Sequence, residues 1–136
     1  MPNYINLFGI GLWDIYDSEP PVLHDRIYHG RPANFTMRVA CVKGEAVELE
    51  LVQPLSGDNI YSDFIAKHGE GIHHLQFLVD DIDETTNIMA KEGFPVLMAA
   101  KFLDGGFAYY DTIEPLKVIW KAFQLPTNMP PMKRYP

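Results

Sequence analysis

The sequence lacks the features that mark secreted and membrane-spanning proteins. Its 136 residues include one cysteine, Cys41, so neither an internal disulfide nor a cluster of thiolate metal ligands can form. The most apolar stretch, 94–103, is interrupted by Pro95 and Lys101, and no apolar run reaches the 18 residues that a membrane-spanning helix needs. No basic and apolar leader is present either. We therefore expect a soluble cytoplasmic protein without membrane contacts.

Basic residues are scarce as well. Lysine and arginine number 11 against 18 acidic residues, which gives a net charge of −7. Proteins that neutralise nucleic-acid phosphates need clustered basic side chains, and the densest pair here is Lys133 and Arg134. These numbers exclude a non-specific nucleic-acid binder. The rest of the composition, 47% hydrophobic and 21% charged, is ordinary for a single globular domain with a sizeable core.

The order of the predicted elements indicates two copies of one unit. We expect a helix over 1–8, strands over 12–16, 35–42 and 45–53, a helix over 61–68, a strand over 72–79, a helix over 81–93, and strands over 95–101, 107–111 and 117–123. Each copy contains one helix followed by three strands, and the first copy has no opening strand. The stretch 22–34 shows no readable pattern. Four prolines in 124–136 make a regular element unexpected there.

Two local signals support this order most strongly. The strand over 35–42 alternates apolar and polar residues, and Lys43 and Gly44 form the turn to the next strand. The helix that begins after Asp81 has Glu84 three residues later, as in a capping box, and Gly93 at its end.

Two segments resemble a known family. Residues 47–55 (VELELVQPL) and 67–82 (KHGEGIHHLQFLVDDI) are similar to the methylmalonyl-CoA epimerase branch of the vicinal oxygen chelate superfamily. Residues 7–13 resemble the end of that family's first helix, so the likeness spans 4–124. The resemblance implies an α+β fold in which two βαβββ modules, about 1–56 and 70–124, form a curved mixed sheet around a cavity. The first module lacks its opening strand, and an extended Pro-rich tail, 125–136, follows the domain.

The resemblance also implies a divalent metal at the cavity floor. In that family the metal holds two substrate oxygens while a carboxylate removes an α-proton. Glu50 and His74 match two of the four usual ligands. A third ligand belongs to the missing strand, and the fourth falls on Trp120. The predicted metal site therefore has two of its four ligands, and no residue matches the family's catalytic base.

Three further residues are candidates for substrate binding. Trp120 has one N–H donor and cannot bind a hard cation, so we expect it to line an apolar pocket. Tyr109 is expected in the cavity wall, with plain strand packing as the alternative. Arg38 could meet an anionic substrate or lie on the surface. Strand alternation turns His73 away from His74, which favours a structural role for His73.

Two functions of different classes fit these residues. One is an isomerase or lyase of the methylmalonyl-CoA epimerase or lactoylglutathione lyase type, acting by metal-assisted proton abstraction on a small acyl thioester or related metabolite. The other is a non-catalytic protein that binds a small molecule and has a degenerate metal site. The incomplete ligand set favours the second function, and the overall likeness favours the first.

The missing strand has two interpretations. It leaves backbone donors and acceptors along a sheet edge, which proteins seldom leave uncovered, so we expect a homodimer in which the partner covers that edge. The second interpretation is that translation starts upstream of Met1 and that the missing strand, with its histidine, precedes this sequence. In-frame coding sequence before Met1 would establish the second.

Overall fold

The computed structural model describes residues 1–130 and 133–135, and in them it contains the predicted α+β fold. The first half contains α1 (Pro2–Phe8), β1 (Trp13–Ser18), β2 (Leu23–Tyr28), β3 (Arg31–Pro32), β4 (Thr36–Lys43) and β5 (Glu48–Ser56), followed by α2 (Ile60–His68). The second half contains β6 (His74–Leu78), α3 (Ile82–Lys91), β7 (Val96–Phe102), β8 (Gly105–Tyr110), α4 (Ile113–Leu116), β9 (Ile119–Gln124) and β10 (Lys133–Tyr135). Within the described residues, no helix is both long and apolar enough to span a membrane.

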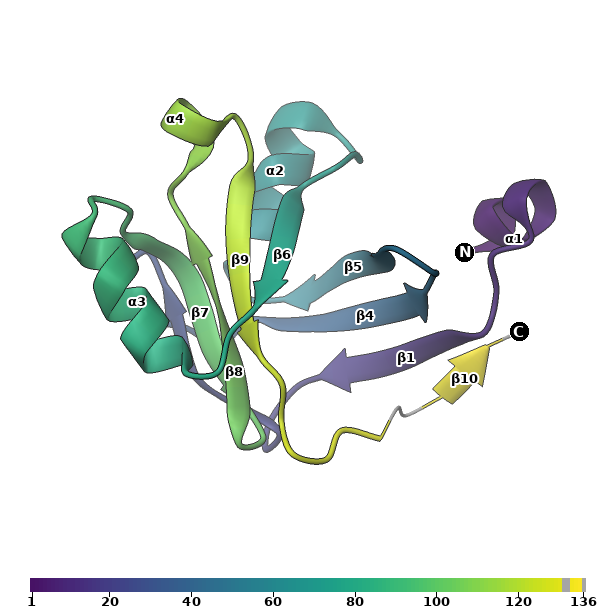
Figure 1. Ribbon diagram of the computed structural model, residues 1–136, viewed down its shortest axis with the longest axis horizontal. Helices are drawn as coiled ribbons and strands as arrows, with labels where there is room; N and C mark the ends of the chain where they lie inside the picture. Colours follow the sequence, from purple (N-terminus) through teal and green to yellow (C-terminus); the bar gives the residue numbers. More distant parts are fainter. Residues whose placement is uncertain (131–132, 136) are drawn as a thin grey trace.

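The strands form two sheets that are not closed into a barrel. One has the order β10-β1-β4-β5 and the other the order β3-β2-β7-β8-β9-β6. Figure 1 shows the first sheet extending to one side of the second, with β4 and β5 running roughly across the direction of β9. All pairs are antiparallel except β6 and β9, which are parallel and bring His74 beside Ile119.

The two modules have the predicted internal correspondence. In the second module, β6 covers the outer edge of β9, whereas β5, the corresponding strand of the first module, is a sheet edge within the described residues. The predicted absence of the first opening strand is therefore confirmed. Helix α3 packs on its sheet through Ile82, against Ala108 and Ala122.

Helix α1 packs against one end of the smaller sheet, on its outer face (Figure 1). Its Tyr4 and Ile5 side chains pack against a cluster that contains Trp13, Ala40 and Val42. Ala40 and Val42 lie on alternate positions of β4, so the opposite face of that strand points toward the second sheet. The largest core lies on this side and includes Met37 of β4.

Both local signals in the sequence correspond to the observed structure. The β4–β5 hairpin pairs Lys43 with Glu48, and the Gly44 N–H donates to the Val47 carbonyl at 2.8 Å. Strand β5 begins three residues later than predicted. The Asp81 side chain caps α3 and accepts from the N–H groups of residues 83 and 84, both at 2.9 Å.

The stretch 22–34, which has no readable pattern in the sequence, forms β2 and β3. Strand β2 pairs with β7, and β3 pairs with the other edge of β2, so both extend the second sheet, although they precede β4 in the chain. The register shifts between His24 and Ile27, and Asp25 has a positive φ of 49°. A bulge of this kind places successive side chains out of alternation, which explains why the pattern was not visible in the sequence.

The expectation that the tail contains no regular element is wrong at Lys133–Tyr135. These three residues form β10 and pair antiparallel with β1, with Tyr135 opposite Trp13. The Arg134 guanidinium donates to both Asp14 oxygens, at 2.6 and 3.0 Å. The strand itself contains no proline. It lies at a sheet edge, where prolines close to it in the chain do not prevent pairing.

Candidate functional site

Three strands bring one acidic, one imidazole and one ammonium group together between the sheets. Glu50 lies on β5, His74 is the first residue of β6, and Lys121 lies on β9. On β9 the side chains of Ile119, Lys121 and Phe123 share one face, since side chains alternate along a strand. Parallel pairing of β6 with β9 places His74 near the same face.

The three groups are in direct contact, and we call Glu50, His74 and Lys121 the Glu–His–Lys network. The Lys121 Nζ lies 2.9 Å from Oε1 and 3.2 Å from Oε2 of Glu50. The His74 Nε2 lies 3.3 Å from the same Oε1. The network therefore joins the smaller sheet to the larger one through a single carboxylate.

The network is largely buried, and its charges shift one another's titration. Burial alone would raise the pKa of Glu50, but the adjacent Lys121 and His74 outweigh it and lower the pKa to about 2. Burial lowers the pKa of His74, and the Lys121 charge adds to this, against the opposing effect of Glu50. Near neutral pH the network therefore contains a carboxylate and a neutral imidazole beside the lysine ammonium group.

His73 extends the network by one further contact. Its Nδ1 lies 3.0 Å from the Nδ1 of His74, and both rings contact Tyr109. A neutral His74 that donates from Nε2 to Glu50 must accept at Nδ1, so His73 is the donor between the two rings. The His73 Nε2 is buried and has no hydrogen-bond partner of good geometry among the described residues. The nearby Ile60 backbone opposes the lowering of the His73 pKa.

The expectation that His73 points away from His74 is therefore wrong. Strand β6 begins at His74, so His73 precedes the strand and does not follow its alternation. The His73 ring packs against Tyr61 and Phe64 of α2, at centroid distances of 5.3 and 5.1 Å. Burial, with the nearby His74, lowers the pKa of His73 to about 4.

Aromatic rings surround the Lys121 ammonium group. Its Nζ lies 5.4 Å from the ring centroid of Phe107, 5.3 Å from that of Tyr109 and 5.4 Å from that of Phe123. Cation–π attraction at these distances stabilises a desolvated ammonium group. Tyr109 is fully buried, and its hydroxyl lies 2.5 Å from that of Tyr61, so this predicted substrate-binding residue faces the network with its ring only.

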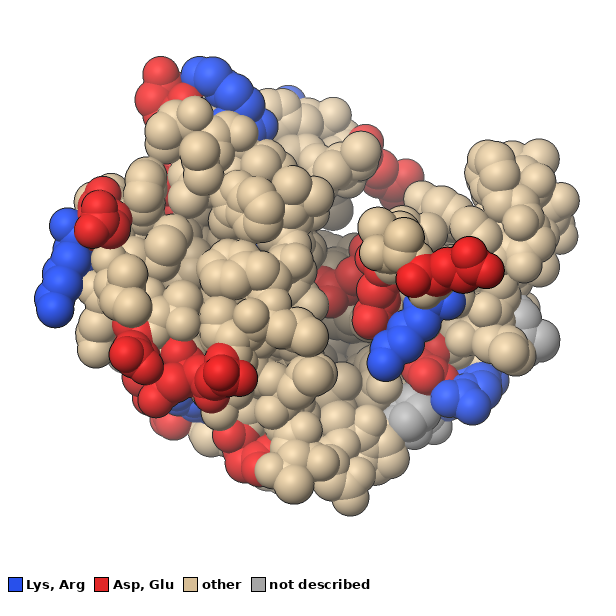
Figure 2. Space-filling model, viewed as in Figure 1, with Lys and Arg blue, Asp and Glu red and all other residues tan. Residues whose placement is uncertain are grey.

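The network borders a hollow between the sheets. Figure 2 shows the surface hollowed at this junction, with acidic side chains at its floor. The side chains of Glu50, His74 and Lys121 keep 19%, 8% and 7% of their surface exposed, so the network is nearly closed to bulk solvent. Cys41 is paired with Glu50 across the hairpin, and burial raises the pKa of its thiol to about 12.

The other two predicted substrate-binding residues lie elsewhere. Arg38 shares the outer face of β4 with Ala40, and its Nε and Nη2 donate to Asp17 at 2.5 and 2.8 Å. The Trp120 ring packs against Phe77, at a centroid distance of 5.9 Å, on the side of the sheet that α3 covers. The structure therefore brings together Glu50, His74 and Tyr109 but not Arg38 or Trp120.

Lys121 is the site residue that the sequence analysis missed. Matching the family's last ligand to Trp120 shifts the strand by one residue, and a one-residue shift turns every side chain to the other face. The signal was present, because Lys121 stands between Ile119 and Phe123 in an apolar alternation where a charged residue is unexpected. Lys121 is only 5% exposed, and a buried ammonium group needs a partner of opposite charge. Glu50 provides that charge.

The residues present do not fit a divalent metal at this position. No group of three or more His, Cys, Asp or Glu side chains suited to a metal ion occurs in residues 1–130 and 133–135. A cation bound to Glu50 would also lie next to the Lys121 ammonium group, which already contacts both carboxylate oxygens. Like charges at such distances repel strongly in a site with little water.

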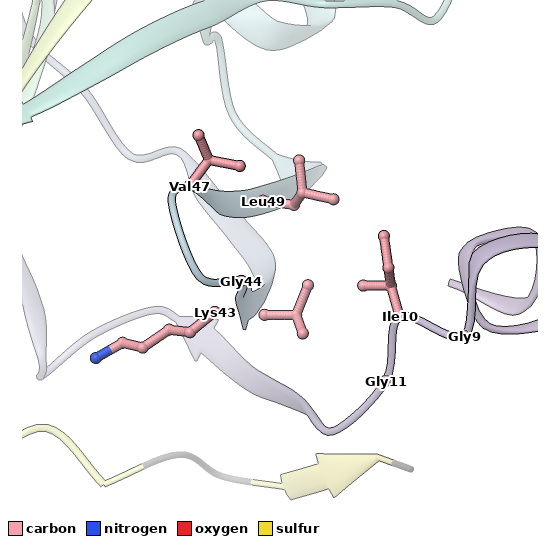
Figure 3. A pocket seen from close by; sticks show the side chains of 8 residues that line it. Gly9, Ile10, Gly11, Lys43, Gly44, Val47 and Leu49 are labelled. Atoms are coloured by element: carbon pink, nitrogen blue, oxygen red, sulfur yellow. The ribbon is translucent and has the colours of Figure 1, made fainter.

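A second hollow lies apart from this network. It measures about 330 Å³ and is bounded by the linker after α1 and by the β4–β5 hairpin, with Ile10, Val47 and Leu49 in its wall (Figure 3). In the same view the Lys43 side chain extends away from these apolar groups. This pocket therefore offers apolar surface but no convergent polar groups.

Comparisons with known proteins agree with the predicted resemblance. A sequence model of the glyoxalase/bleomycin resistance protein/dioxygenase superfamily matches residues 1–110. An uncharacterized protein, YqjC, of Bacillus subtilis is 26% identical over 98 residues, which cover 66% of this chain and 67% of that protein.

Solved structures show the same architecture. The hypothetical protein BH1468 of Bacillus halodurans has a TM-score of 0.67 and 19% identity, covering 94% of this chain and 85% of that one. A methylmalonyl-CoA epimerase in complex with methylmalonyl-CoA and NH4+ has a TM-score of 0.63 and 16% identity, covering 96% and 87%. At these identities the likeness establishes a shared fold.

Proposed function

Because this chain belongs to the glyoxalase/bleomycin resistance protein/dioxygenase superfamily, we propose that it binds a small organic molecule between its two sheets without using a divalent metal. The observation that carries this proposal is the Lys121 Nζ, 2.9 Å from Glu50. The lysine supplies one positive charge where the predicted metal would supply two. The carboxylate of the predicted metal site then holds a covalently attached cation, and the imidazole contacts that carboxylate.

The similarity to the epimerases supports a small-molecule ligand for a protein of this fold. One epimerase of the same fold has been solved with both methylmalonyl-CoA and an ammonium ion. Lys121 carries the same type of cation at the end of its own side chain. Apolar side chains packed at the inner core, Val39, Val52 and Phe123, offer surface for the carbon skeleton of a ligand.

The alternative function is an isomerase or lyase that uses metal-assisted proton abstraction. The proximity of Glu50 and His74, whose Oε1 and Nε2 atoms lie 3.3 Å apart, is the observation that favours it. For this function Lys121 would have to leave Glu50 before a metal could bind. Separating a buried ion pair by removing one partner costs about 3–5 kcal/mol, so the closed network opposes that arrangement.

Two measurements on the intact protein distinguish these functions. Elemental analysis and calorimetric titration with Co2+ and Zn2+ are expected to show no stoichiometric binding that depends on Glu50 and His74. Two-dimensional NMR of metal-free protein with a panel of small organic fragments is expected to show shifts in backbone signals of β5, β8 and β9. Stoichiometric metal that disappears in His74→Gln would overturn the proposal in favour of the enzyme.

The enzyme has a direct assay as well. Exchange of the α-proton of methylmalonyl-CoA in D2O, followed with and without added Co2+, is expected to match the rate without protein. Metal-dependent exchange that is lost in Glu50→Gln would establish the catalytic alternative. Arg38→Gln is a matched control, because its side chain lies on the outer face of β4.

A further inference from the structure

The Lys121 ammonium group has a hydrogen-bond donor to spare. An ammonium group has three N–H donors, and Glu50 provides two acceptor oxygens. The neighbouring rings of Phe107, Tyr109 and Phe123 offer faces rather than oxygen atoms. At least one N–H therefore remains for an oxygen atom that enters from the hollow.

The charge of the network decides what kind of oxygen this is. The Lys121 ammonium and Glu50 carboxylate cancel, and the neutral imidazole of His74 adds no charge. A second carboxylate brought to Lys121 would lie within a few ångströms of Glu50 and repel it. A neutral oxygen accepts the same hydrogen bond without that repulsion.

We infer that the hollow selects a ligand with a neutral carbonyl or phenolic oxygen on an apolar, preferably aromatic, body, and that Lys121 donates a hydrogen bond to this oxygen. This inference rests on the proposed function and adds the ligand class and the residue that recognises it. Glu50 is the residue that excludes carboxylate ligands, since it both holds Lys121 and repels a competing anion. The apolar body contacts the inner surface that includes Val52 and Phe123.

Acetophenone and benzoate form a matched pair of probes for this inference. Both carry one ring and one oxygen-bearing group of similar size, and they differ in charge. Titration of isotopically labelled protein with each compound, followed by two-dimensional NMR, is expected to give shifts centred on β5, β8 and β9. The dissociation constant for benzoate is expected to be at least about tenfold higher than that for acetophenone, a difference of about 1.4 kcal/mol.

The double variant Lys121→Met/Glu50→Gln tests the two roles together. It removes both charges at once, so no unpaired charge is left buried and the fold is expected to persist. In this variant acetophenone is expected to bind at least about fivefold more weakly, and the discrimination against benzoate is expected to disappear. The Lys101→Met variant, which alters an exposed lysine paired with Asp83, serves as the control.

The outcomes separate this inference from the proposed function. If acetophenone binds at the inner face but the double variant leaves its affinity unchanged, the hollow is a ligand site and Lys121 does not recognise the oxygen. If benzoate binds as tightly as acetophenone to the unmodified protein, the selection for neutral oxygens is wrong. If neither compound shifts any inner-face signal up to its solubility limit, both proposals fail.

Discussion

Lys121 shows how a single side chain changes the chemistry of a site. Its ammonium group occupies the space beside Glu50 and His74 that the family resemblance assigns to a metal ion. A metal has several open coordination positions and acts as a Lewis acid, whereas an ammonium group only donates hydrogen bonds and supplies a single charge. The difference favours recognition of a ligand over polarisation of a substrate.

The first prediction concerns the Lys121–Glu50 ion pair. Lys121→Met leaves the Glu50 carboxylate buried without its partner, and we expect the free energy of unfolding to fall by about 3–5 kcal/mol. Adding Glu50→Gln is expected to restore at least about 2 kcal/mol of this loss. Urea denaturation monitored by circular dichroism measures both. Lys101→Met, whose ion pair with Asp83 is exposed, is expected to cost less than about 1 kcal/mol.

The second prediction converts the network into a metal site. Lys121→Glu would place a carboxylate beside Glu50 and His74, which gives three ligands of types that bind divalent cations. We expect this variant to bind Co2+ with a change in its visible absorption and a rise in melting temperature, while the unmodified protein shows neither. Loss of the signal in Lys121→Glu/His74→Gln is the control. Equal Co2+ binding by the unmodified protein would contradict the metal-free interpretation.

At the scale of elements, the pairing of β8 with β9 determines where Lys121 lies. Gly105 begins β8, and a Cβ at this position would come within 2.2 Å of the Gln124 carbonyl oxygen and 2.7 Å of the Pro126 nitrogen. Both atoms belong to the backbone and cannot move aside without shifting the end of β9. The absence of a side chain at Gly105 thus permits the close approach of the two strands.

The third prediction tests this close approach. Gly105→Ala is expected to lower the free energy of unfolding by at least about 2 kcal/mol, because the added methyl group meets backbone atoms. Gly71→Ala is a matched control, since its Cβ would meet only the Phe64 ring at 4.0 Å, an ordinary contact distance. Thermal unfolding of both variants provides the comparison, and equal melting temperatures would show that the strand ends can separate at little cost.

For the whole molecule, the Glu–His–Lys network links the two sheets through buried titratable groups. The fourth prediction concerns its acid sensitivity. His73 has a pKa of about 4 in the folded protein, so between pH 6.5 and 4 it is less protonated there than in the unfolded chain. Folded Glu50, with a pKa of about 2, is likewise less protonated between pH 4.5 and 2. Each group therefore contributes stability that is present at neutral pH and lost as the pH falls.

We expect the free energy of unfolding to fall in two successive ranges, with His73 acting above about pH 4 and Glu50 below it. The slope from one group is at most about 1.4 kcal/mol per pH unit. His73→Gln is expected to flatten the upper range and Glu50→Gln the lower one. Urea titrations at a series of pH values measure the slopes, and unchanged slopes in both variants would show that these groups titrate normally.

The fifth prediction concerns assembly. Strand β5 is a sheet edge within the described residues, while the corresponding strand β9 is covered by β6. Exposed edges of this length invite pairing, so we continue to expect a homodimer in which the partner covers β5. Size-exclusion chromatography with light scattering at micromolar concentration measures the mass. A mass of one chain throughout that range would contradict the expectation.

Local patterns in the sequence were sufficient for most elements and for two members of the network. Alternation predicted β4 and β5, and the Asp81 cap predicted the start of α3. The resemblance then indicated that Glu50 and His74 belong together. Alternation failed where a bulge interrupts it, in β2, and where three residues pair with a distant strand, in β10.

The sequence by itself determined most elements and the missing opening strand, because these follow from periodicity and from motifs that are local in the chain. Its resemblance to a known family indicated the proximity of a carboxylate to an imidazole. Only the tertiary structure decided that Lys121, and not Trp120, faces them. That outcome depends on the register between β8, β9 and β6, and register is set by packing between segments far apart in the sequence. A shift of one residue there would have left the hollow with an indole ring in place of a cation.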